Sequence, residues 1–273
     1  MVTRTVSGII GGLLILMILI FNQSIPILIN LFVALICILT IYEICIAMGI
    51  NKIFKIMLPS VVFSAILPIF GHGAVWKASW YIYTLVMVVI MIFFRKSLSF
   101  KNIAVIYCMT ILISLSLSAI IDLRNWGGNY SNFYVLFALC IPWMADTGAY
   151  FCGNLFGKTK LCPDVSPKKT VEGAVGGIFF CITTNIIIAF VFETWLFKPP
   201  ANINYFYLVL IVVIGSIISI IGDLCFSLVK RSYRVKDFGN VIPGHGGVLD
   251  RFDSVIFVVP FVYFIVKHLD LLS

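Results

Sequence analysis

The chain of 273 residues is 62% hydrophobic and only 11% charged, and its mean hydropathy is +1.12. Soluble globular proteins carry about 25% charged and about 45–50% apolar residues, so this composition excludes an ordinary soluble domain and indicates a polytopic membrane protein. The net charge of +8 fits loops that face anionic lipid headgroups, and we expect no nucleic acid partner. No hydrophilic block is long enough for a separate soluble domain, so we treat 1–273 as a single integral membrane domain.

Apolar runs of about 17–25 residues are long enough for a helix to cross a bilayer. The sequence contains nine such runs, which predict an all-α fold of about nine transmembrane helices. They lie at residues 6–21, 25–48, 53–70, 79–94, 102–121, 132–152, 174–197, 204–229 and 252–269. The first, third and fourth runs are short, so their boundaries are the least well defined.

The placement of Lys and Arg tests this number of crossings, because cytoplasmic loops are enriched in both residues. With nine crossings, 15 of the 19 basic residues fall on the side that holds the N-terminus, and the other 4 fall on the opposite side. This asymmetry predicts a cytoplasmic N-terminus and an external C-terminus.

Polar residues divide the chain into two unequal parts. Up to about residue 130 the expected spans contain one acid, Glu43, and no motif, so we assign 1–130 to packing and lipid contact. We expect 131–273 to carry the chemistry. Residues 222–253 alone hold four of the eleven acids and five of the nineteen Lys and Arg. Charge that is scarce elsewhere is collected there, which indicates a functional site.

The segment 146–150 (DTGAY) places an acid inside a span. Asp146 lies about six residues from the expected cytoplasmic end, which is about 9 Å at ~1.5 Å per residue. An acid at that depth is costly unless it is paired, bound to a metal or in a wet cavity, so a functional role is the first interpretation. The alternative is a carboxylate that pairs with a Lys for packing alone.

The segment 166–173 (SPKKTVEG) precedes the seventh span. Ser166 followed by Pro167 predicts the N-cap and the first residue of a helix. Lys168, Lys169 and Thr170 beside that N-terminus would form an anion site. Two Lys beside a cytoplasmic helix end are also common determinants of topology, and this alternative stays open.

The eighth span carries polar residues on one face. Asp223, Ser227 and Lys230 are spaced i, i+4 and i+7, so they share a side of the helix. Asp223 lies about seven residues, or ~10 Å, inside the expected cytoplasmic end. This depth is close to that of Asp146, so the two acids could open onto one cavity.

Two acids begin the ninth span. Asp250 and Asp253 lie on one face at i and i+3; helix capping could account for one of them, but less easily for both beside Arg251. The glycines around His245 supply backbone that can approach a ligand closely. Charged and titratable residues are dense within the 24 residues 230–253, namely Lys230, Arg231, Lys236, Asp237, His245, Asp250, Arg251 and Asp253.

These groups indicate phosphate chemistry. Hard oxygen ligands favour Mg²⁺, which commonly binds one or two carboxylates plus the phosphates of a substrate. Lys and Arg grouped around such an ion suit phosphate transfer, where catalysis is mostly positioning and charge neutralisation. We expect the site at the cytoplasmic membrane boundary, where a soluble nucleotide and a lipid headgroup can meet.

The charged segment closely resembles the signature of phosphatidate cytidylyltransferases, also called CDP-diacylglycerol synthases, and two upstream segments resemble further motifs of that family. The matching segments are 227–231 (SLVKR), 236–239 (KDFG), 242–253 (IPGHGGVLDRFD), 146–150 (DTGAY) and 166–173 (SPKKTVEG). The resemblance covers about 140–255. The preceding part matches only in hydropathy and in length, which suit the compact bacterial members.

The resemblance implies an activity and its partners. CTP and phosphatidic acid would give CDP-diacylglycerol and pyrophosphate with Mg²⁺, in an integral protein of the bacterial inner membrane whose active site faces the cytoplasm. It further implies that Asp223 and Asp250 hold the catalytic metal with Asp253 beside them, and that the protein can form homodimers in the lipid membrane. Whether a second cation takes part stays open.

We therefore expect catalytic roles for four acids, Asp146, Asp223, Asp250 and Asp253. Expected substrate-binding residues are Ser166, Lys168, Lys169, Thr170, Lys230, Arg231, Lys236, Asp237, His245, Gly246 and Arg251. Among these, Lys168, Lys169, Lys230, Arg231 and Lys236 would neutralise phosphate charge. We place Asp146, Asp253 and His245 outside the metal ligands or on the substrate.

Two other functions fit part of this pattern. A CTP-dependent polyprenol or dolichol kinase would share the membrane placement, the basic loops and Mg²⁺, but it would release CDP instead of pyrophosphate. A cation-coupled secondary transporter would also carry intramembrane acids. It predicts inverted repeats and acids near the midplane, whereas the halves show no repeat and the acids lie toward one face.

Overall fold

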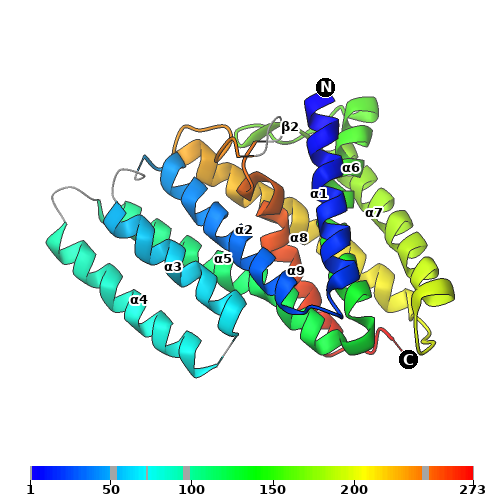
Figure 1. Cartoon of the computed structure of the whole chain (residues 1–273). Helices are drawn as coiled ribbons and strands as arrows, with labels where there is room; N and C mark the ends of the chain where they lie inside the picture. Colours follow the sequence, from blue (N-terminus) through cyan, green and yellow to red (C-terminus); the bar gives the residue numbers. More distant parts are fainter. Residues whose placement is uncertain (1, 50–53, 72, 95–98, 242–245, 273) are drawn as a thin grey trace. The chain divides into compact units, whose positions relative to one another are not determined.

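The computed structural model describes residues 2–49, 54–71, 73–94, 99–241 and 246–272. Over these residues the chain is almost wholly helical, which confirms the all-α prediction (Figure 1). The α-helices are α1 (Val2–Phe21), α2 (Ile27–Ala47), α3 (Phe54–Phe70), α4 (Ala74–Phe93), α5 (Phe100–Gly127), α6 (Ser131–Phe156), α7 (Val171–Val191), α8 (Tyr205–Ser232) and α9 (Leu249–Val266). A 3-10 turn, η1 (Gly128–Tyr130), and a π-helical turn, η2 (Phe192–Leu196), extend α5 and α7, and strands β1 (Lys160–Cys162) and β2 (Ser166–Thr170) form a hairpin.

Each expected span corresponds to one of these helices, in the same order. Within the described ranges, five helical stretches are long and apolar enough to cross a membrane, and two shorter apolar helices accompany them. The long stretches are Ile27–Ala47, Ala74–Phe93, Phe100–Phe156, Val171–Leu196 and Tyr205–Ser232, and the short ones are Ile10–Phe21 and Phe54–Phe70. The class of polytopic membrane protein is therefore confirmed, whereas nine crossings and the orientation of the termini stay predictions.

The chain forms two compact units, each assembled from two separate segments of sequence. Unit 1 contains Met1–Ile121 and Ser232–Phe252, and unit 2 contains Asp122–Arg231 and Asp253–Ser273. Unit 1 thus contains the apolar N-terminal helices together with residues 232–252, which are most of the charged segment 222–253. The division of 1–273 into a packing part and a catalytic part stays a prediction.

In unit 1, helices α2, α3 and α4 lie side by side in chain order (Figure 1). The Asn30 side chain donates to the carbonyl of Pro68 at 2.9 Å, which joins α2 to the end of α3. The rings of Phe63 and Tyr83 stack at 4.5 Å, and the Tyr83 hydroxyl lies 3.0 Å from the Ser60 hydroxyl. Few polar contacts thus connect helices that otherwise pack through apolar side chains.

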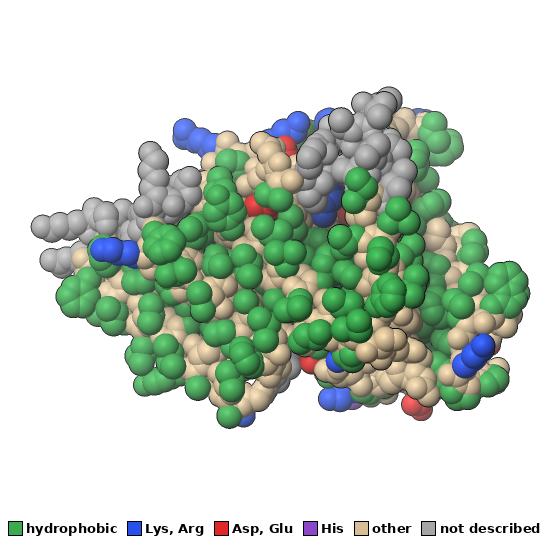
Figure 2. Space-filling view, viewed as in Figure 1, with side chains coloured by type: hydrophobic (Ala, Val, Ile, Leu, Met, Phe, Trp, Pro, Cys, Tyr) green, Lys and Arg blue, Asp and Glu red, His purple; other side chains and the backbone are tan. Residues whose placement is uncertain are grey.

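Many large apolar side chains lie on the outside of the helices. On α4, Tyr81, Ile82 and Phe93 are exposed, and on α7 so are Phe179 and Phe190. Figure 2 shows hydrophobic side chains over much of the helical surface in view, with Lys and Arg mostly near helix ends. Such surfaces are costly in water and favourable in lipid, so they agree with the membrane class.

In unit 2, α6 and α7 pack closely because glycines line their contact. A Cβ added at Gly177 would lie 2.5 Å from the carbonyl oxygen of Ala145, and one added at Gly148 would lie 2.5 Å from the Cβ of Phe180. Small residues commonly allow this close approach between helices in membranes. The two helices therefore form a firm support for the hairpin that connects them.

Candidate active site

The hairpin between α6 and α7 carries two of the predicted phosphate-binding lysines. Its strands are antiparallel, with Lys160 opposite Thr170 and Cys162 opposite Ser166. The prediction of a helix N-cap at Ser166 is wrong, because 166–170 is a strand and α7 begins at Val171. Pro167 is compatible with this strand because a strand at the edge of a sheet tolerates proline.

Thr170 is the residue that caps α7. Its hydroxyl accepts a hydrogen bond from the N–H of Gly173 at 3.1 Å. In the first turn of the helix, the Glu172 carboxylate accepts hydrogen bonds from the N–H groups of Lys158 and Thr159, at 3.0 and 3.1 Å. An acid near a helix N-terminus is also favoured by the helix dipole. These contacts tie both ends of the hairpin to α7.

A cavity of about 650 Å³ lies beside this hairpin in unit 2. Asp146 of α6, Asp223 of α8 and the lysines Lys160, Lys168 and Lys169 line it. Binding sites for small molecules usually enclose about 300–1,000 Å³, so the cavity is large enough for part of a nucleotide. Asp146 and Asp223 line the same cavity, whereas the roles predicted for them stay predictions.

Lys169 and Asp223 form an ion pair at the wall of this cavity. Their side chains are 24% and 20% exposed, so both remain accessible from the cavity while much of each is shielded. Lys168, on the same strand, is exposed. The hairpin thus brings two cations to a carboxylate that a helix supplies, which is an arrangement suited to a phosphate group and a divalent ion.

A second group of charged residues lies deeper in unit 2. Lys230 and Asp253 are buried, with 4.0 Å between the Lys230 ammonium and the Asp253 carboxylate. Asp253 also accepts a hydrogen bond from the N–H of Ser254 at 2.7 Å. Arg231 donates from Nε to the carbonyl of Val165 at 3.4 Å, so its guanidinium reaches the hairpin. Lys230 therefore faces an acid, and its predicted role on phosphate stays a prediction.

In unit 1, the Asp250 carboxylate binds backbone that precedes its own helix. Its Oδ2 accepts hydrogen bonds from the N–H of Phe238 at 2.9 Å and from the N–H of Gly247 at 3.1 Å. Gly246 has a φ of +85°, a conformation that favours glycine. The other predicted residues of this segment, Lys236, Asp237 and Arg251, are exposed, and His245 lies outside the described residues.

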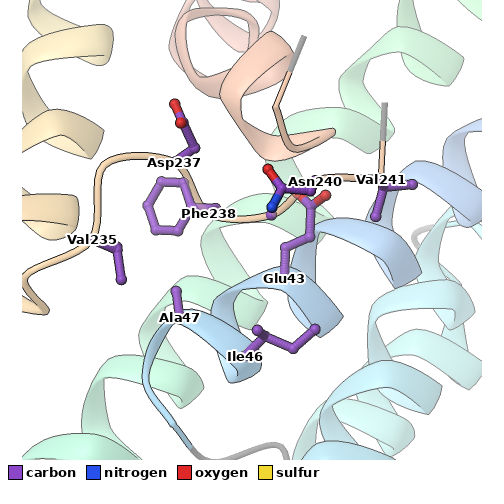
Figure 3. A pocket seen from close by; sticks show the side chains of 9 residues that line it. Glu43, Ile46, Ala47, Val235, Asp237, Phe238, Asn240 and Val241 are labelled. Carbon is purple, nitrogen blue, oxygen red and sulfur yellow. The ribbon is translucent and has the colours of Figure 1, made fainter. Parts of the chain in front are cut away.

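Sequence reasoning missed one residue of this region, Glu43 of α2. Figure 3 shows its side chain directed at the segment that carries Phe238 and Asn240. Its two oxygens accept hydrogen bonds from the N–H groups of Val248 and Leu249, both at 2.8 Å. The signal was a single acid in an otherwise apolar span, which needs a polar partner if it is buried.

The donors expected for Mg²⁺ are of a suitable chemical type. Carboxylate oxygens are hard ligands, and Asp223 faces a cavity whose lysines would accept phosphate beside a cation. In the part of the chain that the structure describes, no group of three or more His, Cys, Asp or Glu side chains is arranged to hold a metal by itself.

The fold defines a helical membrane protein, and one of its cavities is lined by two acids and three lysines. The chain belongs to the cytidylyltransferase family, because residues 2–269 match the model of that family. This match extends well beyond the 140–255 covered by the motif resemblance, and it includes Glu43.

Relatives of known name agree with this membership. Phosphatidate cytidylyltransferase of Bacillus subtilis (strain 168) is 42% identical over 171 residues, which are 63% of this chain and 61% of that protein. The enzyme of the same name from Staphylococcus haemolyticus (strain JCSC1435) is 46% identical over 127 residues, 46% of each chain. That of Staphylococcus aureus (strain COL) is 43% identical over the same length. The matched segments thus span about half to three fifths of these relatives.

Proposed function

We propose that the protein transfers CMP from CTP to phosphatidic acid, giving CDP-diacylglycerol and pyrophosphate at the cytoplasmic face of a bacterial inner membrane. The observation that carries the proposal is the cavity in which Lys169 pairs with Asp223 beside Lys168 and Asp146. Membership of the cytidylyltransferase family and the printed names of the relatives support the choice of nucleotide and lipid.

The reaction joins two polyanions, and this determines what the site must supply. A phosphate monoester has a second pKa of about 6 and is mostly a dianion at neutral pH, so the lipid phosphate is already a nucleophile. Its oxygen bonds to the α-phosphorus of CTP while the bond from that phosphorus to the β-phosphate oxygen breaks. No general base is required. The main barrier is electrostatic, and positive charge lowers it.

The lysines of the hairpin are the proposed source of that charge. Lys168 and Lys169 lie at the cavity and would neutralise the nucleotide phosphates and the departing pyrophosphate. Lys230, Arg231 and Lys236 are proposed to add further positive charge. Side-chain ammonium and guanidinium groups suit this task because they donate several hydrogen bonds to phosphate oxygens.

We propose Asp223 and Asp250 as the protein ligands of Mg²⁺. Bound there, the ion would supply charge neutralisation at phosphate oxygens. The ion pair with Lys169 orients the Asp223 carboxylate, and the N–H groups of Phe238 and Gly247 orient that of Asp250. Asp146, Asp253 and His245 are proposed to support these residues or to contact substrate.

Labelled CTP tests the proposal. Purified protein is incubated in detergent with Mg²⁺ and phosphatidic acid or, in a parallel arm, with a polyprenol. Nucleotidyl transfer sends label from the α-phosphorus of CTP into lipid and label from the γ-phosphorus into pyrophosphate. A kinase would instead send the γ-label into lipid and release CDP. Cation-driven uptake by protein-containing liposomes, without any CTP turnover, would favour a transporter and contradict the proposal.

A further inference from the structure

We propose that Glu43 is a positioning residue. It holds the segment before α9, which here means residues 238–241 and 246–248, and through that segment it holds the carboxylate of Asp250. Glu43 lies in the part of the sequence that we assigned to packing and lipid contact, yet it is fully buried at 0% exposure. Its role in the reaction rests on the proposed function, because Asp250 matters for catalysis only if it binds metal or substrate there. The contact itself does not depend on that function.

Both oxygens of Glu43 are used at the start of α9. Oε1 accepts from the N–H of Val248 and Oε2 from the N–H of Leu249, each at 2.8 Å and across more than 200 residues of sequence. The first N–H groups of a helix have no partner within the helix and carry partial positive charge. A carboxylate delivered from α2 therefore takes the place of a local capping residue.

The segment before α9 approaches Glu43 so closely at two glycines that a side chain at either position would displace its carboxylate. A Cβ added at Gly239 would lie 2.7 Å from Oε1 of Glu43, and one added at Gly247 would lie 2.6 Å from Oε2. Carbon atoms do not come this close to oxygen without displacement of one of them. The two glycines thus allow the backbone to surround the carboxylate.

Two carboxylates divide the N–H groups of this region between them. Glu43 binds those of Val248 and Leu249, and Asp250 binds those of Phe238 and Gly247. Gly247 directly precedes Val248, and Asp250 directly follows Leu249. A shift of the pair held by Glu43 would therefore move the Asp250 carboxylate and one of its donors together.

Packing and hydrogen bonds both contribute to the position of this segment. A cavity of about 430 Å³ lies next to it, lined by Glu43 and Ala47 of α2 and by Asp237, Phe238 and Asn240 (Figure 3). The side chains of Phe238, Val248 and Leu249 are buried, so they anchor the segment by packing, and the hydrogen bonds to Glu43 fix its backbone on the side that faces the cavity. An apolar residue at 43 would suit the span better but would leave the two N–H groups without this partner.

The test compares Glu43→Gln with the wild-type protein. An amide has one acceptor oxygen, and its NH₂ group cannot accept, so one of the two hydrogen bonds is lost with little change in shape. We expect amide hydrogen exchange at Val248 and Leu249 to become at least ~10-fold faster. We also expect the Mg²⁺ concentration for half-maximal activity to rise and turnover to fall, by ~10–100-fold, the range for residues that support metal ligands.

Glu193→Gln is the matched control. Glu193 of η2 also accepts a hydrogen bond from a loop N–H, that of Ile203, and another from the Tyr205 hydroxyl. It lies in unit 2 and is not one of the predicted site residues. Its replacement should leave the Mg²⁺ dependence and the exchange at 248 and 249 unchanged. A loss of stability alone would affect both variants in the same way.

A second variant approaches the contact from the loop. Gly239→Ala keeps residue Glu43 but places a methyl group against its carboxylate, which must move. This variant should therefore show the same exchange and Mg²⁺ effects as Glu43→Gln, and it provides the test if Glu43→Gln does not fold. Unchanged exchange at Val248 and Leu249 in a folded variant would overturn the contact. Faster exchange with normal Mg²⁺ dependence would overturn the positioning role.

The proposed function can fail separately. If the wild-type protein transfers no CMP, the positioning role of Glu43 is tested instead by amide hydrogen exchange measured with and without Mg²⁺. Mg²⁺ alone should then protect peptide amides around Asp250 in the wild-type protein and should require about tenfold more ion in Glu43→Gln, in line with the loss expected for a residue that supports a ligand. Equal protection in both proteins would overturn the positioning role.

Discussion

Lys169 of β2 forms an ion pair with Asp223 of α8 at the wall of the cavity beside the hairpin in unit 2. The hairpin supplies the cation and the transmembrane helix supplies the carboxylate. Because each side chain is mostly shielded from solvent, their attraction is stronger than that of an exposed surface pair. The pair therefore orients the Asp223 carboxylate at the cavity wall, where we propose that a nucleotide phosphate binds.

Replacing either proposed metal ligand should abolish most of the activity. Asp223→Asn and Asp250→Asn each remove a negative charge with little change in shape, and we expect turnover to fall by at least ~100-fold, the upper end for groups that only support a ligand. The measurement is CDP-diacylglycerol formation across a range of Mg²⁺ concentrations. Asp270→Asn, an exposed acid near the C-terminal end of the chain, should behave as wild type. Near-normal turnover in both test variants would remove the assignment of these ligands.

The charge of Lys169 should matter for the nucleotide more than for the lipid. Lys169→Gln removes the ion pair and the proposed phosphate partner, so we expect KM for CTP to rise about tenfold, the change for roughly 1.4 kcal/mol of lost binding. In a double mutant with Asp223→Asn, the loss should be less than the product of the two single losses, because contacting residues couple. Lys198→Gln, outside the cavity, is the control. Independent effects of the two substitutions would show that the pair does not act as a unit.

Thr170 should contribute to stability through the cap of α7. Thr170→Ala removes the acceptor for the Gly173 N–H and should cost about 1 kcal/mol, whereas Thr170→Ser should retain most of the stability. Thermal unfolding in detergent measures the difference. Thr184→Ala is the control within the same helix, because its hydroxyl only donates to the carbonyls of Phe180 and Cys181. Equal loss in both alanine variants would contradict the assignment of the cap.

The close packing of α6 on α7 makes a steric prediction. Gly177→Ala would force a Cβ to 2.5 Å from the carbonyl oxygen of Ala145, so the helices must separate, and we expect a loss of about 1–3 kcal/mol. Gly11→Ala in α1 adds the same methyl group where no atom lies within 4 Å and should be neutral or stabilising. The melting temperatures of the two variants in detergent are compared. A stable Gly177→Ala protein would show that this contact is not tight.

Local patterns in the sequence predict the helices well and the hairpin poorly. Each apolar run forms one helix for two reasons. Its apolar side chains are favourable in lipid, and a helix satisfies the backbone hydrogen bonds within the run itself, so both effects depend only on consecutive residues. The error at Ser166 has a different cause. Ser-Pro is compatible with a helix start and with an edge strand, and the choice depends on Thr170, which caps α7, and on Glu172, which binds the backbone of the preceding loop.

The sequence by itself determined the membrane class, the family and the residues that bear charge, since hydropathy and motifs are properties of neighbouring residues. Only the tertiary structure joined Lys169 to Asp223 and Glu43 to Val248 and Leu249. In sequence, Glu43 is a single acid whose partner is unspecified. Its partners are backbone N–H groups, which every residue except proline carries, so no side-chain pattern identifies them before the helices have packed.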